Sequence, residues 1–166
     1  MRPNVIPTVI GLLSAALFLG GCGMSADKQN HAQNHAMQHA ANGDIRETTG
    51  SLDRLPAFLD DQPSEVKAAY SIAASVHELL AYIPCYCGCG ESAGHQSNLN
   101  CFIHEMQADG SVIWDDHGTR CGVCMETAVL TAKLKQEGKS LTDIRNTIDG
   151  LYQQGYAAPT PTPMPM

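Results

Sequence analysis

The segment SEVKAAYSIAASVHELLAYIPCYCGCG, residues 64–90, joins a helical pattern to a turn with three cysteines and so decides the expected fold. Apolar residues recur along it at helical spacing, namely Val66, Tyr70, Ala73, Val76, Leu80 and Ile83. This stripe predicts an amphipathic helix over residues 64–83. Pro84 cannot continue the helix, because its ring removes the N–H donor. The helix is therefore expected to end directly before the cysteines.

Two further helices and a hairpin are expected after the cysteine turn. The pattern of residues 121–138 predicts a second helix, and Ser140 with Asp143 can cap a third helix that ends before Gly155. Between these patterns and the turn, the Asp109-Gly110 pair is typical of a small β-hairpin, with a short helix followed by a turn as the alternative. The predicted fold class is mainly α, with about three helices packed around a Cys/Gly-rich insert and a small hairpin.

The N-terminus resembles a bacterial lipoprotein signal. Residues 1–21 carry one charge, Arg2, and a short apolar stretch, which is typical of a secretory signal peptide and too short for a secure transmembrane helix. The sequence Leu19-Gly20-Gly21-Cys22 resembles a lipobox, which implies cleavage before Cys22 and lipid on its sulfur. An acylated Cys22 would attach the protein to a lipid bilayer, at the extracytoplasmic face of the cell membrane. The alternative is an ordinary signal peptide followed by a coincidental cysteine.

Composition divides the rest of the chain into three parts. Residues 22–51 begin with the lipidated cysteine and are polar and His-rich, which predicts a flexible tether. Residues 52–156 hold the helical patterns and are expected to form one Cys-rich domain. Residues 157–166 are rich in proline, which is typical of an extended tail. Met164 and Met166 could offer thioethers to Cu(I), but an inert tail is the simpler interpretation.

Charge and compartment limit the possible partners. The net charge of −7 makes the chain poorly suited to nucleic acid, so no such partner is expected. The chain has seven cysteines, of which Cys22 is assigned to lipid. In an exported protein the others must be disulfide-bonded, metal-bound or redox-active.

The alternation of Cys85, Cys87 and Cys89 with glycines indicates a ligand turn. In an extended strand, residues two apart lie about 6.5–7 Å from each other, whereas thiolates on one tetrahedral metal ion lie within about 4 Å. The three sulfurs can therefore converge only if the backbone curls. Gly88 and Gly90 permit such a curl, because glycine adopts positive φ and allows close approach.

Later residues can complete the site. Cys101, Cys121 and Cys124 are candidate thiolate ligands, and His95 is the best candidate nitrogen ligand. The pair Cys121/Cys124 starts a predicted helix, whose positive end is expected to lower thiol pKa values. Thiolates prefer soft ions, and the surplus of thiols over the four that zinc requires favours copper(I), with zinc as the alternative. A protein that donates or accepts the metal is then a further expected partner.

Two other interpretations of the cysteines stay open. Six cysteines could form three disulfides, each contributing about 2–4 kcal/mol to a small exported module. Thiol–disulfide exchange through Cys121/Cys124 is the other alternative, although no βαβ pattern surrounds this pair. The chain has no phosphate loop, no G-x-S-x-G, no HExxH and no dinucleotide fingerprint. An enzyme is therefore not favoured.

Several histidines are accessory candidates. Spaced by four, the tether residues His31, His35 and His39 could take up an ion if they were helical, or could be plain solvated linker. His104 and His117 follow the cysteine turn and could approach the thiols.

Residues around His117 could instead support the site from outside. Asp115 or Asp116 could orient His117, and Arg120 could stabilise thiolate charge, or all of them could form a surface turn. Trp114 is expected to be a packing anchor, and His77 a core or boundary residue.

Two long motifs carry a family resemblance. PCYCGCGESAGHQSNLNCF (84–102) and GSVIWDDHGTRCGVC (110–124) resemble the PCYCGC-motif bacterial lipoproteins over about residues 52–156. The resemblance implies a surface-anchored, cysteine-rich lipoprotein, mainly of Gram-positive bacteria, and assigns no activity. Together with the thiols it leads to one hypothesis: a membrane-anchored protein that captures, stores or delivers a soft metal.

Overall fold

A computed structural model describes residues 37–166. Four strands form one antiparallel sheet in the order β1-β2-β4-β3. Their bounds are Met37–His39 for β1, Ile45–Thr49 for β2, Ile103–Met106 for β3 and Val112–Asp115 for β4. Strand β2 pairs with both β1 and β4, so it lies inside the sheet.

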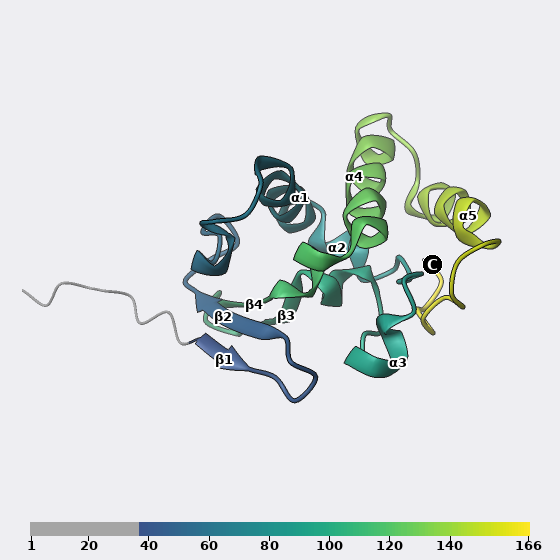
Figure 1. The fold of residues 1–166 in the computed structure, drawn as a ribbon. Helices are drawn as coiled ribbons and strands as arrows, with labels where there is room; N and C mark the ends of the chain where they lie inside the picture. The colour runs from purple at the N-terminus through teal and green to yellow at the C-terminus, as the bar shows by residue number, and fades with distance from the viewer. Residues whose placement is uncertain (1–36) are drawn as a thin grey trace, which may run out of the picture. The chain divides into compact units, whose positions relative to one another are not determined.

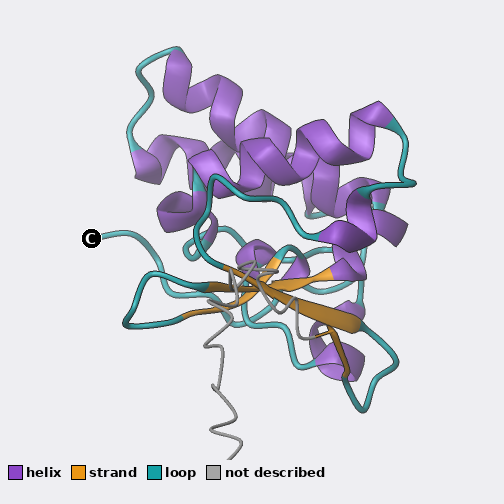
Figure 2. Ribbon diagram, turned by 90° about the vertical axis from the view of Figure 1, so that its left-hand side faces the viewer, coloured by secondary structure: helices purple, strands orange, loops and turns teal. Residues whose placement is uncertain are grey.

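Helices occupy most of the remaining described chain. Their bounds are Ser64–Ser75 for α1, His77–Leu80 for α2, Cys89–Ala93 for α3, Gly122–Gln136 for α4 and Leu141–Tyr152 for α5. Short 3₁₀ helices cover Ala57–Leu59 (η1), Asn98–Cys101 (η2) and Asp116–Arg120 (η3). The three longest helices, α1, α4 and α5, lie together on one side of the sheet (Figures 1 and 2).

The predicted fold class is wrong, because the domain is a mixed α/β fold and not a mainly α one. The four-stranded sheet is the finding that overturns it. The predicted hairpin, β3 with β4, makes only half of this sheet. The other half, β1 and β2, comes from residues 37–49, within the segment interpreted as a tether.

Buried polar side chains hold β2 in place. Glu47 is 0 % exposed, and its carboxylate accepts hydrogen bonds from the backbone N–H groups of Ala57 at 2.8 Å and Phe58 at 3.1 Å. Trp114 is also buried, as predicted, and its indole N–H donates to Oγ1 of Thr49 at 2.8 Å. These bonds compensate the desolvation of polar groups inside the domain.

The predicted helices correspond to observed ones, with one interruption. The helix expected over residues 64–83 is divided at Val76, whose φ of −125° leaves the helical region. The second and third predicted helices are α4 and α5. Ser140 caps α5 as expected, since its side chain accepts a hydrogen bond from the N–H of Asp143. The turn of the β3–β4 hairpin contains Gly110 at a φ of 87°, a conformation that glycine adopts readily.

Tyr70 joins helix α1 to the sheet. Its ring lies 5.1 Å from that of Phe102 and 6.2 Å from that of Trp114, measured between centroids. Its hydroxyl donates to the backbone oxygen of Asp115 at 2.7 Å. Burying an apolar side chain of this size stabilises a fold by about 1.5–3 kcal/mol. The aromatic group fixes the end of β4, where the loop that carries His117 begins.

The C-terminal segment packs along the cysteine turn. The N–H of Ala157 donates to the carbonyl of Tyr86, and Thr160 forms a two-way pair with Cys85 through its own N–H and its Oγ1. Thr160 and Thr162 are buried. Residues 157–166 have no regular secondary structure, and they belong to the folded domain. In Figure 1 this segment is the yellow chain beside the loop that leads to α3.

No helix among residues 37–166 is long and apolar enough to cross a membrane. The predicted signal segment, the lipidation residue Cys22 and the candidate ligands His31 and His35 lie outside the described residues. They stay predictions.

Candidate metal centre

The cysteine turn curls as its glycines predict. The sulfurs of Cys85 and Cys87 lie 3.0 Å apart, far less than the spacing of about 6.5–7 Å in an extended strand. Gly88 has a φ of 85°, in the left-handed region, and directs the chain into α3. Gly90 permits close approach, because a Cβ atom there would lie 2.5 Å from Cγ2 of Thr160. Gly88 therefore has the positive φ that the sequence predicts, whereas the close approach at Gly90 is to the C-terminal segment and not to a sulfur.

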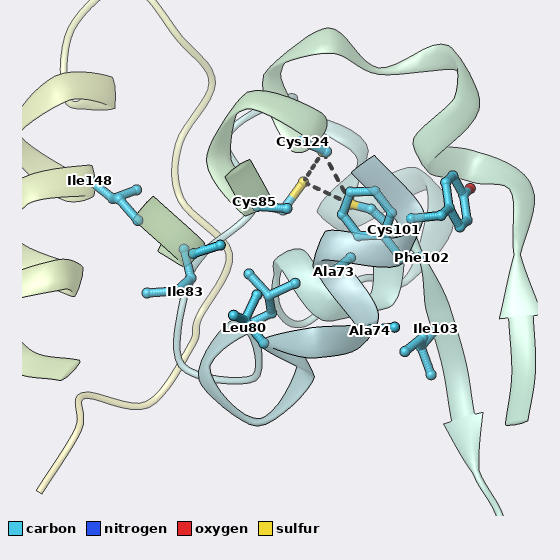
Figure 3. Close-up of a cluster of buried hydrophobic side chains, with 14 of the residues drawn as sticks. Ala73, Ala74, Leu80, Ile83, Cys85, Cys101, Phe102, Ile103, Cys124 and Ile148 are labelled. Atoms are coloured by element: carbon cyan, nitrogen blue, oxygen red, sulfur yellow. Dashed lines mark hydrogen bonds between the residues drawn. The ribbon is translucent and has the colours of Figure 1, made fainter. Parts of the chain in front are cut away.

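Five of the six described cysteines form a thiol cluster centred on Cys124. The Sγ atom of Cys124 lies 3.1 Å from that of Cys101, 3.2 Å from Cys121, 3.6 Å from Cys85 and 3.6 Å from Cys87. Figure 3 shows Cys85, Cys101 and Cys124 pointing toward one another within the hydrophobic core. The turn, η2 and the start of α4 thus bring distant thiols to one point.

His95 contacts the buried side of the thiol cluster. Its Nδ1 atom lies 3.4 Å from Sγ of Cys101, and ligand atoms of Cys85, His95 and Cys101 lie within 4.8 Å of one another. His95 is 4 % exposed. Its Nε2 atom is buried without a hydrogen-bond partner among the described residues. His95 therefore lies where the sequence predicts a nitrogen ligand.

Cys89 and His117 form an outer group with Cys87. Their three ligand atoms lie within 4.8 Å of one another, and all three residues are half-buried. Nδ1 of His117 lies 3.2 Å from both carboxylate oxygens of Asp44. Cys87 belongs to the thiol cluster and to this outer group, because its sulfur lies between them.

The thiol cluster distributes protons unevenly. Hydrogen bonds from Cys101 and then Cys124 lower the pKa of Cys85 to about 5. The pKa of Cys87 is also lowered, first by Cys101 and then by Cys121. The pKa of Cys124 is raised, first by its contact with Cys101. Without a metal, Cys85 and Cys87 therefore favour the thiolate form, which accepts hydrogen bonds from neighbouring S–H groups.

One electrostatic prediction is wrong. The start of α4 was expected to lower the pKa values of Cys121 and Cys124, but both are raised. The sulfur contacts of Cys124 raise its pKa, first through Cys101. For Cys121, the contact with Cys124 lowers the pKa, but Cys87 and burial together raise it further. Cys89 behaves similarly: burial and then Cys87 raise its pKa to about 12.

Some accessory candidates are not brought to the centre. His39 on β1 and His104 on β3 are exposed, and neither belongs to a metal-capable group among residues 37–166. The pKa of His104 is lowered, first because the protein excludes part of the water around its ring and then because of the positive charge of Arg46. His77 is a boundary residue, as predicted, with Nδ1 at 2.8 Å from the carbonyl oxygen of Ala74.

Three residues that hold the ligands in place cannot be recognised from the sequence. Asp44, in the β1–β2 turn, orients His117 in the role that was offered to Asp115 or Asp116. Asn98 donates to the backbone oxygen of Cys124 at 3.4 Å, and Thr160 fixes Cys85. Only the polar character of these residues marks them in the sequence, and this does not distinguish them from surface residues.

The oxidation state of the structure is that of free thiols. All six described cysteines, Cys85, Cys87, Cys89, Cys101, Cys121 and Cys124, are unpaired. The sulfurs of Cys85 and Cys87 lie 3.0 Å apart, well beyond the bond length of about 2.05 Å in a disulfide.

The fold and the centre define a class: a cysteine-rich α/β domain whose clustered thiols and adjacent histidines can hold a metal ion. The chain belongs to the family described as "Protein of unknown function with PCYCGC motif", whose family model matches residues 10–165. This confirms the resemblance carried by the cysteine motifs. Searches of curated proteins and of solved structures found no match.

Proposed function

We propose that the thiol cluster binds a soft transition metal, with copper(I) favoured over zinc. The observation that supports this most is the convergence of four sulfurs on Cys124 at 3.1–3.6 Å. Thiolates on a tetrahedral zinc lie about 2.3 Å from the metal and therefore slightly less than 4 Å from one another. The ligand atoms of Cys85, Cys87 and Cys124 lie within 4.8 Å of one another, a spacing compatible with one shared ion.

The number and chemistry of the ligands favour copper(I). Zinc in a structural site takes four ligands, whereas five thiols and His95 gather here. Soft sulfur ligands suit both copper(I) and zinc, so the surplus of thiols over four is what favours copper(I). Burial of Cys85, Cys101 and Cys124 also shields the thiols from external oxidants.

The proposed role is capture, storage or delivery of the metal at the extracytoplasmic face of the cell membrane. The lipobox-like sequence Leu19–Cys22 supports attachment to the bilayer through acylated Cys22. The net charge of −7 does not favour binding to anionic lipid through the domain itself. A metal donor or acceptor protein would then meet the domain outside the cytoplasm.

Native mass spectrometry on anaerobically purified mature protein tests this proposal. The protein is titrated with copper(I) or zinc, and free thiols are counted before and after removal of the metal. Bound copper(I), with six alkylatable domain thiols after its removal, is the expected result. Three disulfides and no bound metal would instead indicate a disulfide-stabilised module. Zinc bound in preference to copper(I) would contradict the choice of metal and retain the site.

A further inference from the structure

The ligands of the centre differ in their access to solvent. Cys85, Cys101 and Cys124 are 0–1 % exposed, and we call them, with His95, the inner group. Cys87, Cys89 and His117 form the outer group and are half-buried. The Sγ atom of Cys87 also lies 3.0 Å from that of Cys85 and 3.6 Å from that of Cys124. Cys87 therefore contacts the inner group as well as the outer group.

His117 is held in the orientation of a metal ligand. A histidine that binds metal through one ring nitrogen usually donates its other N–H to a carboxylate. Nδ1 of His117 meets the Asp44 carboxylate at 3.2 Å, and Asp44 is itself 2 % exposed and held by Arg120 and Asn42. This leaves Nε2 of His117 for the ion.

We propose that the centre has two metal positions that share the Cys87 thiolate. The inner position is closed by buried thiols, and the outer position is formed by Cys87, Cys89 and His117. The ion enters and leaves through the outer position. This inference rests on the proposed function, and it assigns the exchange of metal to named residues.

The outer position suits exchange because its three ligands are only half-buried, so a thiol of an acceptor protein can reach an ion there. A thiol of the acceptor protein forms a metal–sulfur bond as the bond to Cys89 breaks. The proton of the acceptor thiol passes to the released Cys89 thiolate, and the oxidation state of the metal does not change. The inner position cannot be reached in this way, since its sulfurs are buried.

Stoichiometry measured with copper(I) alone tests the inference. Native mass spectra of the anaerobic mature protein are compared for the wild type, Cys89→Ser, His117→Gln and the control His104→Gln. His104 is an exposed histidine outside both groups. We expect two bound ions in the wild type and in His104→Gln, and one in each of the other variants. Circular dichroism verifies that each variant is folded, and His117→Gln serves if Cys89→Ser is not.

Other results would contradict the outer position, the assignment of its ligands, or the proposed function. A single ion in the wild type that persists in Cys89→Ser overturns the outer position but leaves the proposed function intact. Two ions in both folded variants, or none in either, overturns the assignment of ligands. No ion in the wild type overturns the proposed function itself. The rate of copper(I) transfer to a competing thiol chelator gives a second test. The single ion of Cys89→Ser should be transferred more slowly than the first ion of the wild type.

Discussion

The carboxylate of Asp44 lies 3.2 Å from the imidazole Nδ1 of His117, although 73 residues separate them in the chain. Asp44 immediately precedes β2, and His117 follows β4 in η3. The pairing of β2 with β4 brings the two residues together. The sheet therefore positions a candidate ligand of the metal centre as well as closing the core.

Substitution of Asp44 tests this relationship. Asp44→Asn should lower the affinity for the outer ion by about 10–100-fold, the usual effect of losing a partner that orients a ligand. The inner ion of the same sample is the internal reference, and Asp53→Asn, at an exposed position, is the matched control. Titration against a competing chelator measures both affinities. Equal weakening of both ions would show a general disturbance of the fold.

The protonation of His117 gives a prediction for pH. Its pKa is raised to about 9, first by Cys87 and then by Asp44, while burial opposes the shift. The imidazole of the metal-free protein is therefore expected to be charged at pH 7 and to lose its proton as pH rises through about 9. NMR titration of the His117 ring protons measures this midpoint. In Asp44→Asn the midpoint should fall only in part, because Cys87 is the larger cause; a wild-type midpoint near 6.5 would contradict the geometry.

Cys124 should be the most sensitive thiol. Serine is a poor ligand for soft ions, and Cys124 contacts four other sulfurs, whereas Cys121 lies at the edge of the thiol cluster and is half-buried. Cys124→Ser should reduce copper(I) affinity by more than about 100-fold, beyond the effect of losing an orienting partner. Cys121→Ser should reduce the copper(I) affinity by a smaller factor. Competition with a copper(I) chelator measures both, and the reverse order would contradict the central place of Cys124.

The contact between Gly90 and the C-terminal segment can be tested by one added methyl group. A Cβ at residue 90 would meet Cγ2 of Thr160 at 2.5 Å, whereas a Cβ at Gly122 meets nothing within 4 Å. Gly90→Ala should reduce the free energy of unfolding by about 1–3 kcal/mol. Gly122→Ala, in α4, should be neutral or slightly stabilising. Urea denaturation compares the two, and equal stabilities would show that the segment is not packed as described.

Glu47 offers a test of the unexpected half of the sheet. Glu47→Ala removes the acceptor for the N–H groups of Ala57 and Phe58, so stability should fall by about 1–3 kcal/mol. Glu105→Ala, at an exposed position of β3, is the control and should change stability by less than about 0.5 kcal/mol. Thermal unfolding measures both. A neutral Glu47→Ala would indicate that β2 contributes little to the fold.

Strand β2 is not predicted from the sequence because the side chains that it buries are polar. Strand β2, with the sequence IRETT, has no alternation of apolar and polar residues. Its inward side chains bond to groups outside the strand: Glu47 to the N–H groups of Ala57 and Phe58, and Thr49 to the indole of Trp114. Hydrophobic periodicity cannot detect such a strand. By contrast, the β3–β4 hairpin has the Asp109-Gly110 turn pair, which the sequence analysis uses to predict it, and the mostly apolar strand β4.

The candidate centre was more predictable than the fold. Cysteine spacing and the flanking glycines predict that Cys85, Cys87 and Cys89 converge. The sulfurs of Cys85 and Cys87 do lie 3.0 Å apart, but Cys89 is outside the thiol cluster and groups only with Cys87 and His117. The separation of Cys89 from the inner thiols was not predictable, because it depends on the φ of Gly88 and on the start of α3. The pKa directions at Cys121 and Cys124 also depend on tertiary contacts between sulfurs.

X-ray absorption spectroscopy of the copper(I)-loaded mature protein, prepared without oxygen, identifies the atoms that bind the ion. We expect a first coordination shell dominated by sulfur, with a nitrogen contribution that decreases in His117→Gln. A first shell of oxygen and nitrogen alone, or a protein that retains no copper(I) for the measurement, would contradict the proposed function.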